Sequence, residues 1–277
     1  MPAKNNVVSC QWLLEHLHDP DLIIFDAGMA PVGSEAPYLA KLKILGAQRF
    51  DFSHHVVDTT NRLPNTMPND EQFTALVQQM GVNTKSTLVV YDDIGVYSAP
   101  RAWWMFKVMG FDNVYVLNGG LPAWQACGGA TQTHYSEAQT RGDFVGHRHA
   151  ARLIGADTVL ASIDDSSTLL LDARAKDRFS GEQAEPRAGM RAGHIPQSKN
   201  LPFAQLVHNG LLKPKTELAS IFSQLVPQEV KTLQFSCGSG VTACILALGA
   251  AEVGYQNLAV YDGSWSEWGA NPDLPIC

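Results

Sequence analysis

The sequence is poor in features that mark several large classes of proteins. It has five cysteines in 277 residues, an odd number spread along the chain, which argues against a disulfide framework and predicts free thiols in a reducing compartment. No window approaches the roughly 18 consecutive apolar residues of a membrane span. The N-terminal segment also lacks the cationic start and unbroken apolar stretch of a signal or transit peptide. We therefore expect a cytoplasmic protein without a membrane partner.

Positive charge is also scarce. Lysine and arginine together number 20 against 27 acidic residues, which gives a net charge of -7 and a pI near 5.7. Nucleic acids and anionic membranes select basic surfaces, so neither is an expected partner. The content of 45% hydrophobic and 17% charged residues is typical of a globular protein, and the length favours two domains.

The two halves of the chain resemble each other at a constant offset. Gly110 matches Gly254, Gly119 matches Gly263 and Trp124 matches Trp268, always 144 positions apart. Around the last pair, Val-Leu-Asn-Gly-Gly-Leu-Pro-Ala-Trp resembles Val-Tyr-Asp-Gly-Ser-Trp-Ser-Glu-Trp. Such self-similarity indicates duplication of one structural unit.

Short apolar runs alternate with longer helical stretches in both halves. Residues 87–91 and 232–235 have the pattern of buried strands, and residues 99–110 and 242–254 that of the helices that follow them. This alternation predicts an α/β protein in which each half is a parallel sheet flanked by helices. We expect a first unit over residues 1–130, a polar linker over 131–150 and a second unit over 151–277.

One loop carries the clearest chemical signal. In the second half, a predicted strand leads into Cys237-Gly238-Ser239-Gly240-Val241-Thr242 and then into an apolar helix. Two glycines allow the backbone to curl so that successive amides point at an anion beside a helix N-terminus. The thiolate of a cysteine placed there is stabilised, as is an anionic persulfide on the same sulfur. We therefore predict that Cys237 is a nucleophile.

The cysteines can also be interpreted as purely structural residues. Cysteine is often a small buried residue at the end of a strand, which is the alternative reading of Cys237. Cys244 lies inside the following helix and is expected to belong to the core. The matching loop of the first half begins with Asp92-Asp93 and has no cysteine, so we expect it to shape one wall of a cleft rather than to carry sulfur.

The chain resembles the rhodanese superfamily, and within it the two-domain 3-mercaptopyruvate sulfurtransferases. The resemblance covers nearly the whole chain and rests on the following motifs: Tyr97-Ser-Ala-Pro-Arg101, Asp172-Ala-Arg174, Arg178-Phe179, Glu185-Pro-Arg187, Gly193-His-Ile-Pro196, the Cys237 loop and Tyr261-Asp-Gly-Ser-Trp265. It implies two tandem rhodanese-like domains. It also implies that Cys237 takes sulfur from a donor as a persulfide and passes it to a thiol, such as that of thioredoxin, or to cyanide, without a cofactor.

The resemblance also assigns the remaining site residues. It implies catalytic roles for Cys237 and Ser239 and substrate binding by Arg178 and Arg187, whose guanidinium forks suit a carboxylate; each arginine, taken alone, could equally form a surface or interdomain ion pair. Arg191 is a third candidate, and Tyr97 is expected to contact substrate from the first half. Loop amides of Gly238, Gly240, Val241 and Thr242 are expected to stabilise the charged sulfur and the developing enolate.

The donor and the reaction class have alternatives. Thiosulfate sulfurtransferases of this architecture typically carry Arg and Lys after the cysteine, whereas Gly238 and Ser239 here are neutral and favour 3-mercaptopyruvate, with release of pyruvate. Thiosulfate remains the second donor candidate. A related phosphatase would need an arginine where this chain has Ala243. A non-catalytic interaction module is the remaining alternative.

One departure from the family concerns proton transfer. Some relatives carry an acidic residue and a histidine in the first domain, proposed to form a relay to the loop serine. The matching positions here are Ser53 and Asn65, so a relay ending on Ser239 is not expected. His54, His55, His147 and His149 lack matching cysteines or carboxylates and are interpreted as surface residues rather than metal ligands.

Overall fold

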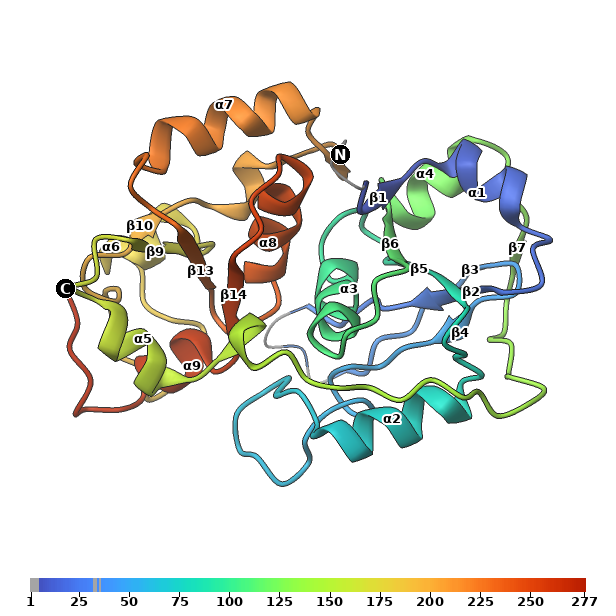
Figure 1. Ribbon diagram of the computed structural model, residues 1–277, viewed down its shortest axis with the longest axis horizontal. Coiled ribbons are helices and arrows are strands. Elements are labelled where there is room, and N and C mark those ends of the chain that lie inside the picture. The colour runs from blue at the N-terminus through green and yellow to red at the C-terminus, as the bar shows by residue number, and fades with distance from the viewer. Residues whose placement is uncertain (1–4, 32–33, 35) are drawn as a thin grey trace.

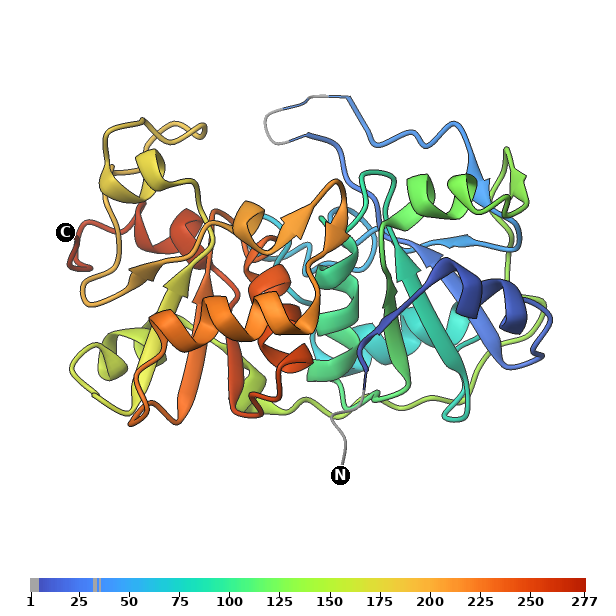
Figure 2. The same ribbon diagram turned by 90° about the horizontal axis from the view of Figure 1, so that it is seen from above.

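The computed structural model describes residues 5–31, 34 and 36–277. It consists of two α/β units side by side, the first coloured blue to green and the second yellow to red (Figures 1 and 2). The start of the predicted first unit, residues 1–4, lies outside the described residues. Each unit contains a five-stranded parallel sheet with helices on both faces, which confirms the predicted fold class.

The two sheets have the same strand order, as expected for a duplication. In the first sheet the order is β1 (Val7–Val8), β6 (Val114–Leu117), β5 (Thr87–Tyr91), β2 (Leu22–Asp26) and β4 (Gln48–Arg49). In the second it is β8 (Leu153–Ile154), β14 (Leu258–Tyr261), β13 (Thr232–Ser236), β9 (Thr168–Asp172) and β10 (Lys199–Asn200). In both sheets, the apolar run that we predicted forms the central strand.

The helices bury opposite faces of each sheet. The first unit contains α1 (Cys10–His16), α2 (Asp70–Gln79), α3 (Ala99–Val108) and α4 (Gly120–Ala126), and the second contains α5 (Ala156–Ser162), α6 (Lys176–Ser180), α7 (Lys215–Leu225), α8 (Ala243–Glu252) and α9 (Ser264–Trp268). Leu13 of α1 and Trp124 of α4 belong to one small core, and Phe73 of α2 belongs to the main core on the other face. Val159 of α5 and Trp268 of α9 form the corresponding small core of the second unit.

The main core runs through both units without interruption. Helix α3 is buried along its whole length, α8 is buried at nearly every position, and the two helices face each other at the junction (Figure 1). Their apolar side chains belong to a single cluster with residues of both sheets. Burial of this much apolar surface fixes one unit against the other.

Several short elements complete the chain. They are β3 (Lys43–Ile44) paired with β7 (Thr131–Gln132), the hairpin of β11 (Val207–His208) and β12 (Leu211–Leu212), and the 3-10 turns Ala150–Arg152 and Phe203–Gln205. The stretch between the units lies along the first one. Its backbone donates from Gly142 to Gln78 and from Phe144 to Val82, and Phe144 is buried in the main core.

Candidate active site

A cavity of about 140 Å³ opens beside the carboxyl end of β13, where ligands of parallel sheets usually bind. Its walls come from both units. Met29 and Tyr97 belong to the first, and the second supplies Ala173, Arg174, Ala175, Arg178, Arg187, Phe203, Cys237, Gly238, Ser239, Val241 and Thr242. The structure thus brings Cys237, Ser239, Arg178, Arg187 and Tyr97 together around one small space.

Cys237 directly follows the last residue of β13 and is 1% exposed. Its backbone is held by the start of α9, where the Trp265 amide donates to the Cys237 carbonyl over 3.0 Å. Ser264 lies in the left-handed region with φ 49°. From there its hydroxyl accepts from the amides of Cys237 (3.2 Å) and Gly240 (3.1 Å) and donates to the carbonyl of Tyr261 (2.8 Å). Ser264 therefore holds the backbone of the cysteine loop in its curled conformation.

This arrangement determines which amides remain for an anion. The amide of Gly240 donates to Ser264 and Gly240 does not line the cavity, in contrast to its predicted role. The amides of Gly238, Ser239, Val241 and Thr242 have no hydrogen-bond partner within the described part of the chain. Their residues do line the cavity, directly before α8. The electropositive N-terminus of that helix adds to the attraction for a negative sulfur.

Three arginines line the cavity, Arg174, Arg178 and Arg187, and they differ in their partners. Arg178 donates to Glu185 over 2.5 Å, and the same carboxylate accepts from Arg174 over 2.7 Å. Glu185 is almost fully buried, so its charge is compensated by these two guanidinium groups. Arg187 donates only to the hydroxyl of Ser266, over 3.2 Å, and forms no ion pair in the structure as described. Its positive charge is thus available to a ligand.

Ser266 links Arg187 to the cysteine loop. Its hydroxyl donates to the carbonyl of Gly238 over 2.6 Å, and its amide donates to the same oxygen over 2.9 Å. Arg187 therefore lies within two hydrogen bonds of the residue that follows Cys237. No role is predicted from the sequence for Ser264, Ser266 or Glu185. Ser264 and Glu185 lie in motifs on which the family resemblance rests, and Ser266 directly follows one of them.

Tyr97 reaches the cavity from the first unit. Burial raises the pKa of its hydroxyl, and negative charge on the neighbouring Cys237 adds to the rise. The phenol therefore stays protonated at neutral pH and remains a hydrogen-bond donor. Its ring lies edge-on to Phe203 of the second unit, with centroids 5.7 Å apart.

Ser53, Asn65 and Ser239 form a chain of hydrogen bonds across the interface. The Ser53 hydroxyl donates to Asn65 Oδ1 over 2.9 Å, and Asn65 Nδ2 donates to Ser239 Oγ over 3.3 Å. Asn65 is buried and has φ 60°, a conformation that asparagine tolerates better than most residues. None of the three side chains ionises near neutral pH. The chain of hydrogen bonds orients Ser239 but contains no general base.

A buried ion pair supports the same loop. Arg101 of α3 is fully buried and donates to Asp262 over 2.7 Å, to the Asn65 carbonyl over 2.6 Å and to the Gly240 carbonyl over 3.4 Å. Asp262 also accepts from the Met67 amide over 2.9 Å. The first unit thus supports the cysteine loop through charge-assisted hydrogen bonds, which are the stronger kind.

Other candidates lie away from the cavity. Arg191 donates to the carbonyls of Gly269, Trp268 and Asn271 behind α9 and does not reach the site. Burial raises the pKa of Cys244 to about 12, so its thiol stays protonated.

Among the described residues, no group of three or more His, Cys, Asp or Glu side chains could hold a metal ion. Within residues 5–31, 34 and 36–277, no helix has the length and apolarity needed to cross a membrane.

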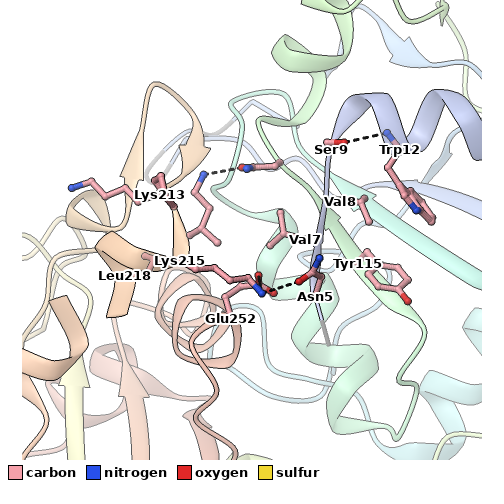
Figure 3. Close-up of a pocket in the computed structure, with 13 residues that line it drawn as sticks. Asn5, Val7, Val8, Ser9, Trp12, Tyr115, Lys213, Lys215, Leu218 and Glu252 are labelled. Atoms are coloured by element: carbon pink, nitrogen blue, oxygen red, sulfur yellow. Dashed lines mark hydrogen bonds and ion pairs between the residues drawn. The ribbon is translucent and has the colours of Figure 1, made fainter. Parts of the chain in front are cut away.

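A larger hollow of about 580 Å³ lies on the seam between the units (Figure 3). Two of its charged groups pair with each other, since Lys215 contacts Glu252 over 3.2 Å, and Lys215 also donates to Asn5 over 2.8 Å. No cysteine lines this hollow. The chemistry predicted from the sequence therefore belongs to the smaller cavity.

Comparison with known proteins gives consistent matches over nearly the whole chain. The Rhodanese-like domain family matches twice, over residues 9–127 and 155–271. The 3-mercaptopyruvate sulfurtransferase of Escherichia coli K12 is 38% identical over 273 residues, which cover 97% of this chain and 96% of that protein. Rat thiosulfate sulfurtransferase is 35% identical over 272 residues, which cover 95% and 91%. The crystal structure of SseA from Escherichia coli, a 3-mercaptopyruvate sulfotransferase, superposes with a TM-score of 0.84 at 36% identity and covers 95% of this chain and all of that one.

Proposed function

The chain belongs to the rhodanese-like domain family, and from this premise we propose that it is an enzyme that transfers sulfur from 3-mercaptopyruvate to a thiol or to cyanide through a persulfide on Cys237. The observation that carries this proposal is the pairing of two features in one cavity. Cys237 lines the same cavity as loop residues whose amides have no partner among the described residues, and Arg187 offers a positive charge that no carboxylate of the described chain neutralises. A nucleophilic sulfur and a carboxylate anchor are what this donor requires.

The reaction needs two changes of bonding. The Cys237 thiolate attacks the sulfur of 3-mercaptopyruvate, a sulfur–sulfur bond forms, and the carbon–sulfur bond breaks with its electron pair moving onto the pyruvate enolate. The enolate takes up a proton and leaves as pyruvate. The outer sulfur of the persulfide then passes to the acceptor, which regenerates the Cys237 thiolate.

Each part of the cavity has a role in this sequence. The Arg187 fork binds the donor carboxylate, and the amides of Gly238, Ser239, Val241 and Thr242 stabilise negative charge on sulfur and on the enolate oxygen. The Tyr97 hydroxyl, kept protonated by burial, donates a hydrogen bond from the other wall. Arg178 also lines the cavity, but its ion pair with Glu185 reduces the positive charge that it offers to the donor carboxylate.

The geometry favours 3-mercaptopyruvate over thiosulfate as donor. Thiosulfate carries two charges next to the reacting sulfur, and the residues that follow Cys237 are uncharged. In 3-mercaptopyruvate the single carboxylate is separated from the sulfur by two carbons, so Arg187, which lines the same cavity as Cys237, can bind it although the residues next to the cysteine are uncharged. Comparison of kcat/KM for the two donors therefore tests the assignment.

The persulfide itself is testable by mass spectrometry. Incubation with 3-mercaptopyruvate followed by digestion should add the mass of one sulfur to the peptide that contains Cys237, together with release of one equivalent of pyruvate. Cys237→Ser should abolish both signals, whereas Cys277→Ser, which alters an exposed thiol, should leave them unchanged. An unmodified Cys237 peptide after pyruvate release would refute the mechanism, and a folded but inactive wild-type protein would favour the interaction module.

A further inference from the structure

The loop of the first unit is occupied by one of its own side chains. Asp92 directly follows β5 as Cys237 directly follows β13, and these two strands are the central strands of equivalent sheets. Asp92 thus takes the position in the first unit that the nucleophile takes in the second. Helix α3 begins after this loop as α8 begins after the cysteine loop.

The Asp92 carboxylate accepts five backbone hydrogen bonds. Oδ1 accepts from the amides of Ile94 (3.1 Å) and Gly95 (2.7 Å), and Oδ2 accepts from those of Tyr97 (3.0 Å), Ser98 (2.8 Å) and Ala99 (2.8 Å). The side chain is fully buried. Such a set of inward amides at a helix N-terminus is the usual arrangement around a bound anion.

Among the described residues, no lysine or arginine forms an ion pair or a hydrogen bond with this carboxylate. Burial raises the pKa of Asp92 to about 6, and the backbone amides of Ile94, Gly95, Tyr97 and Ala99 act in the opposite direction. The carboxylate is therefore ionised at pH 8. In the described structure its hydrogen-bond donors are all backbone amides, the donors that bind an anion at a helix N-terminus.

The residues that Asp92 holds reach the catalytic cavity. Tyr97, whose amide donates to Oδ2, lines the cavity that contains Cys237. Ala99 begins the helix from which Arg101 reaches Asp262 and the Gly240 carbonyl. Asp92 is therefore linked to the Cys237 cavity in two ways, through Tyr97 and through the start of the helix that carries Arg101.

We propose that the first unit retains an anion-binding loop that the Asp92 carboxylate occupies as an internal ligand, and that this occupant positions Tyr97 and Arg101 at the Cys237 cavity. Asp92 is a positioning residue, because it touches neither donor nor acceptor. The occupancy of the loop by Asp92 does not depend on the proposed function, whereas the effect on turnover rests on the function proposed above. Removal of the carboxylate leaves a site for a small external anion of the same chemistry, a monocarboxylate.

Chemical rescue tests this proposal directly. Asp92→Ala should lower Tm by about 5–10 °C, since five buried amides lose their acceptor, and should lower kcat/KM by about tenfold. Formate or acetate at pH 8 should then restore at least half of the lost Tm in a saturable manner and raise kcat/KM over the same concentration range. Sodium chloride at equal ionic strength should do neither, and the wild type should not respond to formate.

Two further variants control for damage to the fold. Asp93→Ala removes the neighbouring carboxylate, which accepts none of the five amides, and should keep the wild-type Tm and kcat. Asp92→Asn keeps the volume but turns an amide group toward backbone donors, so it should lose stability and should not respond to formate. If Asp92→Ala does not fold unaided, the yield of refolding with and without formate replaces the Tm measurement.

The outcomes separate the two proposals. A wild-type Tm for Asp92→Ala or Asp92→Asn, or a formate effect no larger than that of chloride, would overturn the internal-anion assignment. Rescue of Tm without rescue of turnover would overturn the positioning role alone. If the wild type shows no sulfur transfer from any donor, the proposed function fails while the Tm measurement still decides whether Asp92 is an internal ligand.

Discussion

At the residue scale, Arg178 and Arg187 show how neighbours change the use of identical side chains. The family resemblance predicts substrate binding by both, and each has a guanidinium fork that suits a carboxylate. Arg178 already donates to a buried carboxylate, that of Glu185. Arg187 donates only to a neutral hydroxyl, that of Ser266. We therefore infer that Arg187 is the principal anchor of the donor carboxylate.

Replacement of each arginine tests this inference. Arg187→Ala should raise KM for 3-mercaptopyruvate about tenfold or more, because a charged hydrogen bond contributes about 1.5–3 kcal/mol, and Arg187→Lys should recover only part of the loss. Arg178→Ala should have the smaller effect on KM. Steady-state kinetics with both variants decide the matter, and an unchanged KM for Arg187→Ala would contradict the assignment.

At the scale of elements, the cysteine loop is shaped by segments distant in sequence. At the start of α9, the hydroxyls of Ser264 and Ser266 form hydrogen bonds with the backbone of the loop. The loop after β4 supplies Asn65, which donates to Ser239. The chain of hydrogen bonds from Ser53 to Ser239 is uncharged, so it contains no ionisable group for a proton relay.

An ionisable group introduced into this chain should reveal its link to the reacting sulfur. Asn65→Asp places a carboxylate next to Ser239 at a φ that aspartate tolerates. As pH rises through the pKa of that carboxyl, its charge should repel the anionic sulfur and reduce kcat/KM by about tenfold.

The measurement is kcat/KM between pH 5 and 9. The wild type should show no such ionisation, and Asn61→Asp, in an exposed turn of the same segment, should match the wild type. A profile for Asn65→Asp that coincides with the wild-type profile would show that Asn65 is not coupled to the cysteine loop.

At the scale of the whole molecule, the two units are joined by one continuous core and by polar contacts at its edge. Glu252, near the end of α8, accepts from the backbone amide of Asn6 over 2.5 Å and pairs with Lys215 (Figure 3). We propose that residues 1–130 and 151–277 are the two domains and that 131–150 connects them. The connection packs against the first unit along much of its length.

The Glu252 contacts should matter for stability. Glu252→Ala should lower the free energy of unfolding by about 2–3 kcal/mol, because buried donors at Asn6 lose a charged acceptor. Lys215→Ala removes the half-exposed partner and should cost less than about 1 kcal/mol. Urea denaturation of both variants provides the comparison, and equal losses would show that the ion pair, rather than the junction with Asn6, stabilises this edge.

The sequence by itself determined the features that depend on neighbours along the chain. Alternating apolar runs and helical stretches predicted two parallel sheets flanked by helices, because backbone geometry and burial impose these periods locally. The internal repeat identified the equivalent loops of the two halves. The glycines near Cys237 predicted a tightly curved backbone before α8. The sequence also predicted that residues 53 and 65 form no charged proton relay to Ser239, because serine and asparagine side chains are neutral in any surroundings.

Only the tertiary structure decided how these loops are completed. It showed that Ser264 accepts a hydrogen bond from the Gly240 amide and that the Asp92 carboxylate fills the first loop. It also showed that Glu185 pairs with Arg178, whereas Arg187 has no carboxylate partner among the described residues. Hydrogen bonds have short reach and strict geometry. Whether residues far apart in sequence form them depends on how strands, helices and whole units dock, and local sequence patterns do not record that docking.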